Sequence, residues 1–134
     1  MKLTKAQQMM LDIEKIVGGS INVIYGTVIF DTVLNVDEMK KAVNEIYRIN
    51  PILRTLLVSV DGYTEQFVED YSPRDIEVIE FLSKEEVHKY ANENAQIPFD
   101  MNGSLCSLKI FISKDFCGVA YKLHHIMSDG WTLS

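Results

Sequence analysis

The chain has 134 residues, which suits one domain around a single core, and its 47% hydrophobic and 24% charged residues argue against both a disordered chain and a disulfide-stapled miniature. The net charge of -6 argues against the basic stripe with which proteins bind nucleic acid. The apolar stretches are far shorter than the roughly 20 residues that cross a membrane, and the N-terminus lacks an apolar signal core, so we expect a cytoplasmic protein without membrane contact.

Three helices are predicted from one shared start signal, a capping side chain followed three residues later by Glu or Gln. The pairs are Thr4 with Gln7, Asn35 with Glu38, and Ser83 with Glu86. The first helix should end at Gly18-Gly19, the second before Pro51 and the third before Pro98. The side chains expected to face the core recur at helical spacing: Met10, Ile13 and Val17; then Val36, Met39, Val43 and Ile46; then Val87, Tyr90, Ala91 and Asn94.

Six segments rich in β-branched and aromatic residues predict strands. They are residues 21–30, 53–60, 63–68, 76–81, 105–112 and 116–125. Asp61-Gly62 joins two of them in a tight hairpin, because this dipeptide readily takes positive φ values. The order is a helix followed by β-α-β-β-β-α-β-β. It predicts an α+β fold, a two-layer mixed sheet packed by helices.

The two cysteines, Cys106 and Cys117, are expected to be free thiols. Both fall on a predicted hairpin that turns at Lys114-Asp115. With that turn Cys117 lies opposite Ile112, about 20 Å along the strand from Cys106, whereas a disulfide needs Cα atoms within about 7 Å. We interpret both as small buried hydrophobic residues, in preference to a nucleophile, which would need a base beside it.

One motif near the end of the sequence carries the functional signal: His124-His125-Ile126-Met127-Ser128-Asp129-Gly130. Adjacent residues of a strand point to opposite faces, so only one of His124 and His125 can face a given cleft. The same alternation argues against a metal site, which needs its ligands on one side. Taken alone, such a pair indicates a structural role, with one ring packed and the other solvated.

The whole motif resembles HHxxxDG, the signature of the condensation domains of nonribosomal peptide synthetases, in the chloramphenicol acetyltransferase-like superfamily. Three further segments resemble that family in the same order: Thr4-Lys5-Ala6-Gln7, residues 50–55 with Arg54, and Pro98-Phe99-Asp100. Asn50 stands where histidine is usual and Met9 where arginine is usual. The resemblance implies a chloramphenicol acetyltransferase-like N-terminal half, with residues 1–134 as the N-terminal lobe of a truncated condensation domain whose C-terminal lobe is absent.

The resemblance also implies the activity, which is amide bond formation between acyl or aminoacyl thioesters on donor and acceptor carrier proteins. Their phosphopantetheine arms are substrates, and no directly bound cofactor or metal is expected. The second histidine, His125, would be the catalytic residue, as proton acceptor or positioning group. An isolated lobe should be inactive, and we expect it to self-associate through the apolar face left uncovered by the missing lobe.

Four residues are expected to support the motif. The resemblance implies a salt bridge between Asp129 and Arg54, in preference to an orienting contact from Asp129 to a histidine. His124 is expected to be architectural, and Gly130 to allow either a positive φ or a close approach of substrate. Two alternative functions stay open, a coenzyme A-dependent acyltransferase of the same superfamily and a noncatalytic interaction module that retains the fold.

Overall fold

The computed structural model describes residues 1–127 of the chain. Its elements follow the predicted order, and every strand lies within its predicted segment. In chain order they are α1 (Lys5–Val17), β1 (Val23–Phe30), α2 (Val36–Ile49), the 3-10 turn η1 (Pro51–Arg54), β2 (Thr55–Val60), β3 (Tyr63–Val68), β4 (Val78–Glu80), α3 (Lys84–Ala95), β5 (Cys106–Ile112) and β6 (Cys117–His124). Among the described helices, none is long and apolar enough to cross a membrane.

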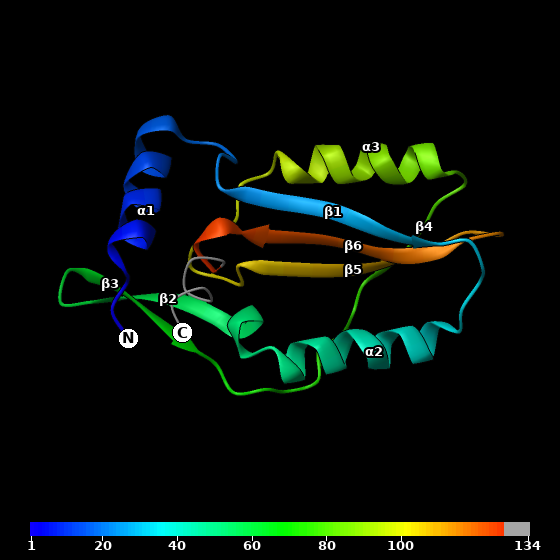
Figure 1. The fold of residues 1–134 in the computed structure, drawn as a ribbon, viewed down its shortest axis with the longest axis horizontal. Helices are drawn as coiled ribbons and strands as arrows, with labels where there is room; N and C mark the ends of the chain where they lie inside the picture. Colours follow the sequence, from blue (N-terminus) through cyan, green and yellow to red (C-terminus); the bar gives the residue numbers. More distant parts are fainter. Residues whose placement is uncertain (128–134) are drawn as a thin grey trace.

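Four strands form one mixed sheet in the order β1-β6-β5-β4 (Figure 1). β6 runs antiparallel to both β1 and β5, whereas β4 runs parallel to β5. β2 and β3 form a separate antiparallel hairpin. Its turn residues Asp61 and Gly62 have φ values of 50° and 82°, as their sequence predicts. The α+β class with a mixed sheet is therefore confirmed.

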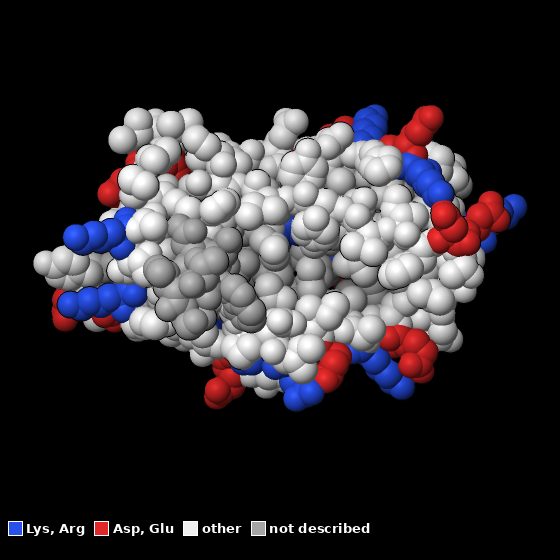
Figure 2. All heavy atoms as spheres, viewed as in Figure 1, with Lys and Arg blue, Asp and Glu red and all other residues white. Residues whose placement is uncertain are grey.

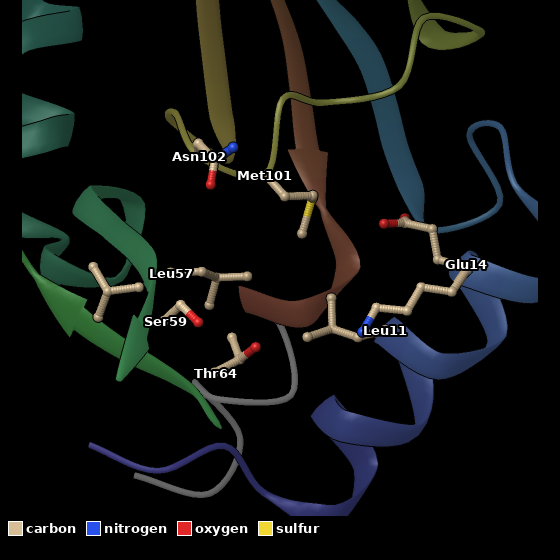
Figure 3. Close-up of a pocket in the computed structure, with 9 residues that line it drawn as sticks. Leu11, Glu14, Leu57, Ser59, Thr64, Met101 and Asn102 are labelled. Atoms are coloured by element: carbon tan, nitrogen blue, oxygen red, sulfur yellow. The ribbon is translucent and has the colours of Figure 1, made fainter. Parts of the chain in front are cut away.

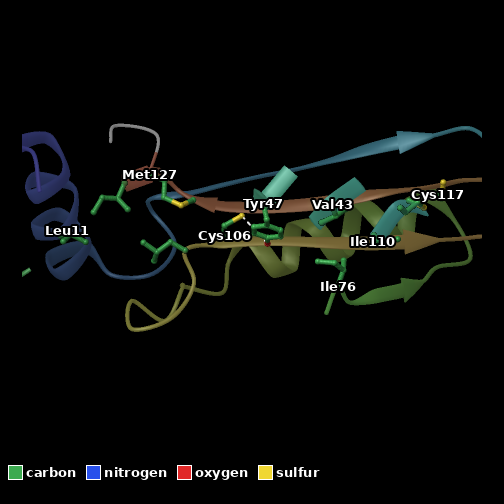
Figure 4. Packing of buried hydrophobic residues seen from close by; sticks show 11 residues of the cluster. Leu11, Val43, Tyr47, Ile76, Cys106, Ile110, Cys117 and Met127 are labelled. Carbon is green, nitrogen blue, oxygen red and sulfur yellow. Dashed lines mark hydrogen bonds between the residues drawn. The ribbon is translucent and has the colours of Figure 1, made fainter. Parts of the chain in front are cut away.

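The sheet carries a helix on each face, as two neighbouring residues of β5 demonstrate. Ile110 belongs to a buried cluster with Met39 and Val43 of α2 (Figure 4). Phe111 packs instead with Val87 of α3. Because adjacent strand residues point to opposite faces, α2 and α3 cover opposite sides of the sheet. The packing is thus three layers deep, one more than the two layers expected. α1 lies across the end of the sheet where β6 finishes (Figure 1).

α1 begins with the predicted capping box, in which Thr4 and Gln7 each donate a backbone N–H to the other's side chain. Its core face differs from the expected one. Gln7 and Leu11 are buried, whereas Ile13 and Val17 are 40% and 62% exposed. The expectation that Ile13 and Val17 face the core was therefore wrong. The helix turns a polar side chain inward instead, where hydrogen bonds satisfy it.

The β5–β6 hairpin has the predicted register, because Cys117 pairs with Ile112. Cys106 pairs with Leu123 at the far end, and both cysteines are buried free thiols, as predicted. Burial raises the pKa of Cys106 to about 11, although a hydrogen bond with Tyr47 works in the opposite direction. The nucleophilic thiolate of Cys106 is therefore scarce near neutral pH, which supports its interpretation as a core residue.

The surface over β1 is apolar. Figure 2 shows charged side chains around the periphery of the view and few over its middle, where β1 crosses the view of Figure 1. β1 is an edge strand of the sheet. On its face turned away from α3, Ile24, Val28 and Phe30 are 36%, 47% and 42% exposed. We call these three residues the β1 patch.

Gly118 occupies the most crowded glycine position of the sheet. A Cβ built there would overlap the carbonyl oxygen of Val28 on the paired strand and come within 2.5 Å of the Phe111 ring. We predict that Gly118→Ala lowers the free energy of unfolding by about 3 kcal/mol, because neither neighbour can move aside without disturbing the sheet. Urea denaturation measures this change.

Gly103→Ala is the matched control. Its Cβ would meet its nearest neighbour, the carbonyl oxygen of Asp100, at an ordinary 3.6 Å. We expect this variant to stay within about 0.5 kcal/mol of the unsubstituted chain. Equal loss of stability in both variants would contradict the crowding at Gly118.

Candidate functional site

The predicted site lies where β6 ends, beside α1 (Figure 1). β6 ends at His124, and a helical turn begins at His125, so the strand is one residue shorter than expected at this end. The side chain of His124 is almost fully buried, at 1% exposure, whereas His125 is partly exposed. The two adjacent histidines therefore have different surroundings.

His124 uses both of its ring nitrogens in hydrogen bonds. The backbone N–H of Ile126 donates to Nδ1 over 3.0 Å, so Nδ1 carries a lone pair and no proton. The proton of the neutral ring is then on Nε2, which donates to Oε1 of Glu14 over 3.0 Å. The Phe99 ring packs nearby, with its centroid 6.2 Å from that of the imidazole. The two partners thus assign the tautomer of His124.

Asn22, in the segment that leads into β1, connects Glu14 with the turn at His125. Its Nδ2 donates to the carbonyl oxygen of Met10 over 3.1 Å and to Oε1 of Glu14 over 3.4 Å. The backbone carbonyl oxygen of Asn22 accepts the backbone N–H of His125 over 2.7 Å. The sequence motif pointed to neither Glu14 nor Asn22. The available signal for Glu14 was its place seven residues after Gln7, on the same helix face.

Gln7 ties the turn to α1 and to the β2–β3 hairpin. Its Nε2 donates to the carbonyl oxygen of Ile126 over 2.9 Å, and its amide exchanges two hydrogen bonds of 3.1 Å with the amide of Gln66. Its Oε1 also accepts the N–H of Thr4. The side chain is 1% exposed, and each of these contacts satisfies a polar group. The Thr4–Gln7 segment singled out in the sequence therefore contacts the histidine turn directly.

The backbone of His125 is hydrogen-bonded to Asn22, and the residue is partly exposed. Its Nδ1 is buried and has no hydrogen-bond partner within the described part of the chain. Most buried polar atoms have a partner, so this nitrogen is an exception among residues 1–127. The ring is not sealed inside the core.

Arg54 lies at the end of η1 and holds neighbouring backbone. Its guanidinium donates to the carbonyl oxygens of Tyr47, Glu69 and Arg48 over 3.0, 2.7 and 3.4 Å. The first and last of these are at the C-terminal end of α2, where free carbonyls attract a positive charge. Asp129 and Gly130 lie outside the described residues. The salt bridge between Asp129 and Arg54 therefore stays a prediction.

An open pocket of about 290 Å³ borders Glu14 on the side of the β2–β3 hairpin (Figure 3). Its walls come from α1, from both strands of the hairpin and from the loop before β5. The lining residues are Leu11, Glu14, Lys15, Leu57, Val58, Ser59, Thr64, Met101 and Asn102. Neither histidine of the motif is among them. The pocket therefore touches the histidine site only through Glu14, the partner of His124.

The arrangement offers one imidazole for proton transfer or hydrogen bonding. Both ring nitrogens of His124 are bonded, to Glu14 and Ile126, whereas the Nδ1 of His125 has no partner in the described part of the chain. Between residues 1 and 127, no three His, Cys, Asp or Glu side chains come together in a way that could hold a metal ion. Of the two histidines, His124 is buried with both ring nitrogens bonded, and His125 is the partly exposed one.

Comparison with known proteins gives the family. The family model described as the condensation domain matches residues 1–134. The chain belongs to the condensation-domain family. A nonribosomal peptide synthetase of Penicillium thymicola, penN, is 29% identical over 103 residues, which are 75% of this chain and 4% of that protein. Enniatin synthase of Fusarium equiseti is 26% identical over 103 residues, 75% of this chain and 3% of that protein.

Solved condensation domains share the fold of this chain. The starter condensation domain of rhizomide synthetase RzmA superposes with a TM-score of 0.84 at 14% identity, covering 97% of this chain and 34% of that one. The first condensation domain of the CDA synthetase gives a TM-score of 0.77 at 15% identity, covering 92% and 35%. The chain therefore spans about a third of these solved domains and a few per cent of the curated synthetases.

Gln7 provides a test of how this part of the condensation domain is held. Gln7→Ala would leave the buried carbonyl of Ile126 and the Oε1 of Gln66 without the donor that Gln7 supplies. We predict a loss of about 3 kcal/mol in the free energy of unfolding, since each unsatisfied buried group costs about 1–3 kcal/mol. Thermal and urea unfolding measure the change.

The neighbouring Gln8 is the control, because it is exposed and its side chain bonds only to Asp12 within the described residues. Gln8→Ala makes the same substitution one position further along α1. We expect a change below about 0.5 kcal/mol. If Gln7→Ala were no more damaging than Gln8→Ala, the network around Ile126 would not contribute to stability.

Proposed function

We propose that this chain is the N-terminal lobe of a condensation domain that forms amide bonds between thioesters carried on donor and acceptor carrier proteins. The family, shown over residues 1–134, supports the reaction class. The observation that carries the assignment to His125 is its partial exposure, together with a buried Nδ1 that has no hydrogen-bond partner among residues 1–127. The phosphopantetheine arms of the carrier proteins act in this proposal as substrates, with no resident cofactor.

The proposed chemistry is aminolysis of a thioester. The amine of the acceptor attacks the thioester carbonyl of the donor, a C–N bond forms, and the C–S bond breaks as the thiolate leaves. A free α-amine has a pKa of about 7.7–8.0, so the neutral amine is accessible near pH 7 at a cost of about 1 kcal/mol. His125 therefore need not deprotonate the amine beforehand. It accepts the proton of the zwitterionic tetrahedral adduct, or positions that adduct by a hydrogen bond.

The supporting residues have separate proposed roles. His124, buried between Glu14 and Ile126, is architectural and does not meet substrate. Arg54 and Asp129 form the proposed ion pair that shapes the segment after the histidine turn. If that pair is buried, removing either partner strands a charge and costs several kcal/mol. Gly130 allows close approach of substrate or a positive φ.

A coenzyme A thioester as donor is the second candidate. The starter condensation domain of rhizomide synthetase RzmA has been solved in complex with C8-CoA, and its R148A variant in that state superposes on this chain with a TM-score of 0.80. Parallel assays that offer the same acyl group on a carrier protein and on coenzyme A separate the two donors. Faster turnover with the free coenzyme A thioester would favour this candidate.

His125→Ala tests the catalytic assignment in the complete domain, because we expect residues 1–134 alone to form no product. We predict that the rate of amide formation falls by about 10²- to 10⁴-fold, the range that a positioned acid or base contributes. Single-turnover assays with loaded carrier proteins and mass detection of the product measure the rate. His125→Gln, which can hydrogen-bond but cannot titrate, separates positioning from proton transfer.

His88→Ala is the matched control for this substitution, because His88 is exposed on α3. We expect it to leave the rate unchanged. The catalytic assignment fails if His125→Ala, with its fold intact by circular dichroism, retains the full rate.

We also propose that residues 1–134, studied alone, self-associate through the β1 patch. An exposed apolar edge strand favours pairing with a second copy, and a lysine on it opposes this. Val28→Lys should therefore lower the average mass measured by light scattering at high concentration. Val60→Lys makes the same change at a similarly exposed residue of the β2–β3 hairpin, 42% against 47%, and should leave the mass unchanged. A strictly monomeric unsubstituted chain would contradict the proposal.

A further inference from the structure

We propose that Glu14 is a positioning residue for His125 and acts through His124. Glu14 is on α1, more than a hundred residues from the motif in sequence, yet its Oε1 is 3.0 Å from Nε2 of His124. This inference rests on the proposed function, because it takes His125 as the residue that meets the substrate. It adds a residue that the motif does not contain.

Glu14 selects the tautomer of His124. A neutral imidazole has one N–H donor and one lone-pair acceptor. A carboxylate at Nε2 can only accept, so Glu14 requires the proton on that nitrogen and leaves the lone pair on Nδ1. The lone pair then receives the backbone N–H of Ile126 over 3.0 Å. With the proton on Nδ1 instead, two N–H groups would face each other in a site where the His124 side chain is 1% exposed.

His124 is bonded in turn to the segment that carries His125. Three backbone groups of this turn have defined partners. The N–H of His125 bonds to Asn22, the N–H of Ile126 to His124, and the carbonyl of Ile126 to Gln7. The direction of the His125 side chain depends on this backbone. Glu14 contacts both Asn22 and His124, so it supports two of the three attachments.

Glu14 would affect catalysis only indirectly, through the position of the turn. Glu14 bonds to His124 and Asn22, and within the described residues no hydrogen bond joins it to His125. Its side chain is 19% exposed, so it is partly shielded from water. Loss of its carboxylate should let the turn shift while the bulk of the fold stays intact. Displacements of about 1 Å at a reacting group can reduce rates by up to about 100-fold.

The experiment compares three substitutions on α1. Glu14→Met removes the acceptor but keeps the side-chain length, Glu14→Gln keeps an acceptor oxygen, and Asp12→Asn removes a carboxylate that bonds only to Gln8 within the described residues. Nitrogen-15 NMR of the chain reports which ring nitrogen of His124 carries the proton. Amide hydrogen exchange reports how firmly the N–H groups of His125 and Ile126 are held.

We expect Glu14→Met to mix the two tautomers of His124 and to speed exchange of the Ile126 amide by about tenfold or more. In the complete domain it should lower kcat between about tenfold and 100-fold with little change in KM. Glu14→Gln should restore the tautomer and most of kcat, and Asp12→Asn should match the unsubstituted protein.

Two results would overturn the inference. One is a proton on Nδ1 of His124 in the unsubstituted chain. This measurement does not depend on whether any variant folds. The other is a folded Glu14→Met variant with unchanged tautomer and amide exchange. Absence of amide formation by the unsubstituted complete domain would instead overturn the proposed function, while the NMR measurements would still decide whether Glu14 positions the turn.

Discussion

The hydrogen bond from the N–H of Ile126 to Nδ1 of His124 is the contact on which the site depends. A polar ring buried at the end of a sheet is tolerated only if both of its nitrogens have partners. One partner comes from the turn that follows the ring, and the other comes from Glu14 on α1. The need to satisfy His124 thus fixes α1 across the end of β6, and that placement defines where His125 emerges.

Two identical side chains acquire different chemistry here because their surroundings differ. His124 ends a strand and faces protein on all sides, so both nitrogens are used inside the fold. His125 begins a helical turn, which breaks the strict alternation expected of a strand and brings its ring to partial exposure. Histidine serves either purpose because its neutral ring offers one donor and one acceptor. Local backbone geometry therefore decides which member of the pair is available.

Local patterns predicted the elements of this fold well. The capping residues Thr4, Asn35 and Ser83 each cap the helix they predict, and the Asp61-Gly62 turn and the β5–β6 register follow from neighbouring residues. The strand order of the sheet was out of reach, because it depends on pairings between distant segments. The HHxxxDG resemblance led to the family and to the fold. It did not reveal the partners of the histidines.

The core faces of the helices were harder to predict for a related reason. In α1, periodic apolar residues suggested a face with Ile13 and Val17, yet the helix buries Gln7, whose partners Gln66 and Ile126 are 59 and 119 residues away. In α2, Tyr47 is buried and Ile46 is 41% exposed. The spacing of apolar residues cannot reveal a polar side chain that is buried because distant groups bond to it.

The strand order of the sheet has a consequence for how the molecule is made. β1 is an edge strand whose only sheet neighbour among the described residues is β6, with Val23 opposite His124 and Phe30 opposite Cys117. A ribosome must therefore release the chain as far as residue 124 before β1 can pair with β6 along its whole length. Until then the apolar strand β1 stays unpaired in the nascent chain. Such late pairing slows folding and leaves an apolar segment exposed, to which chaperones bind.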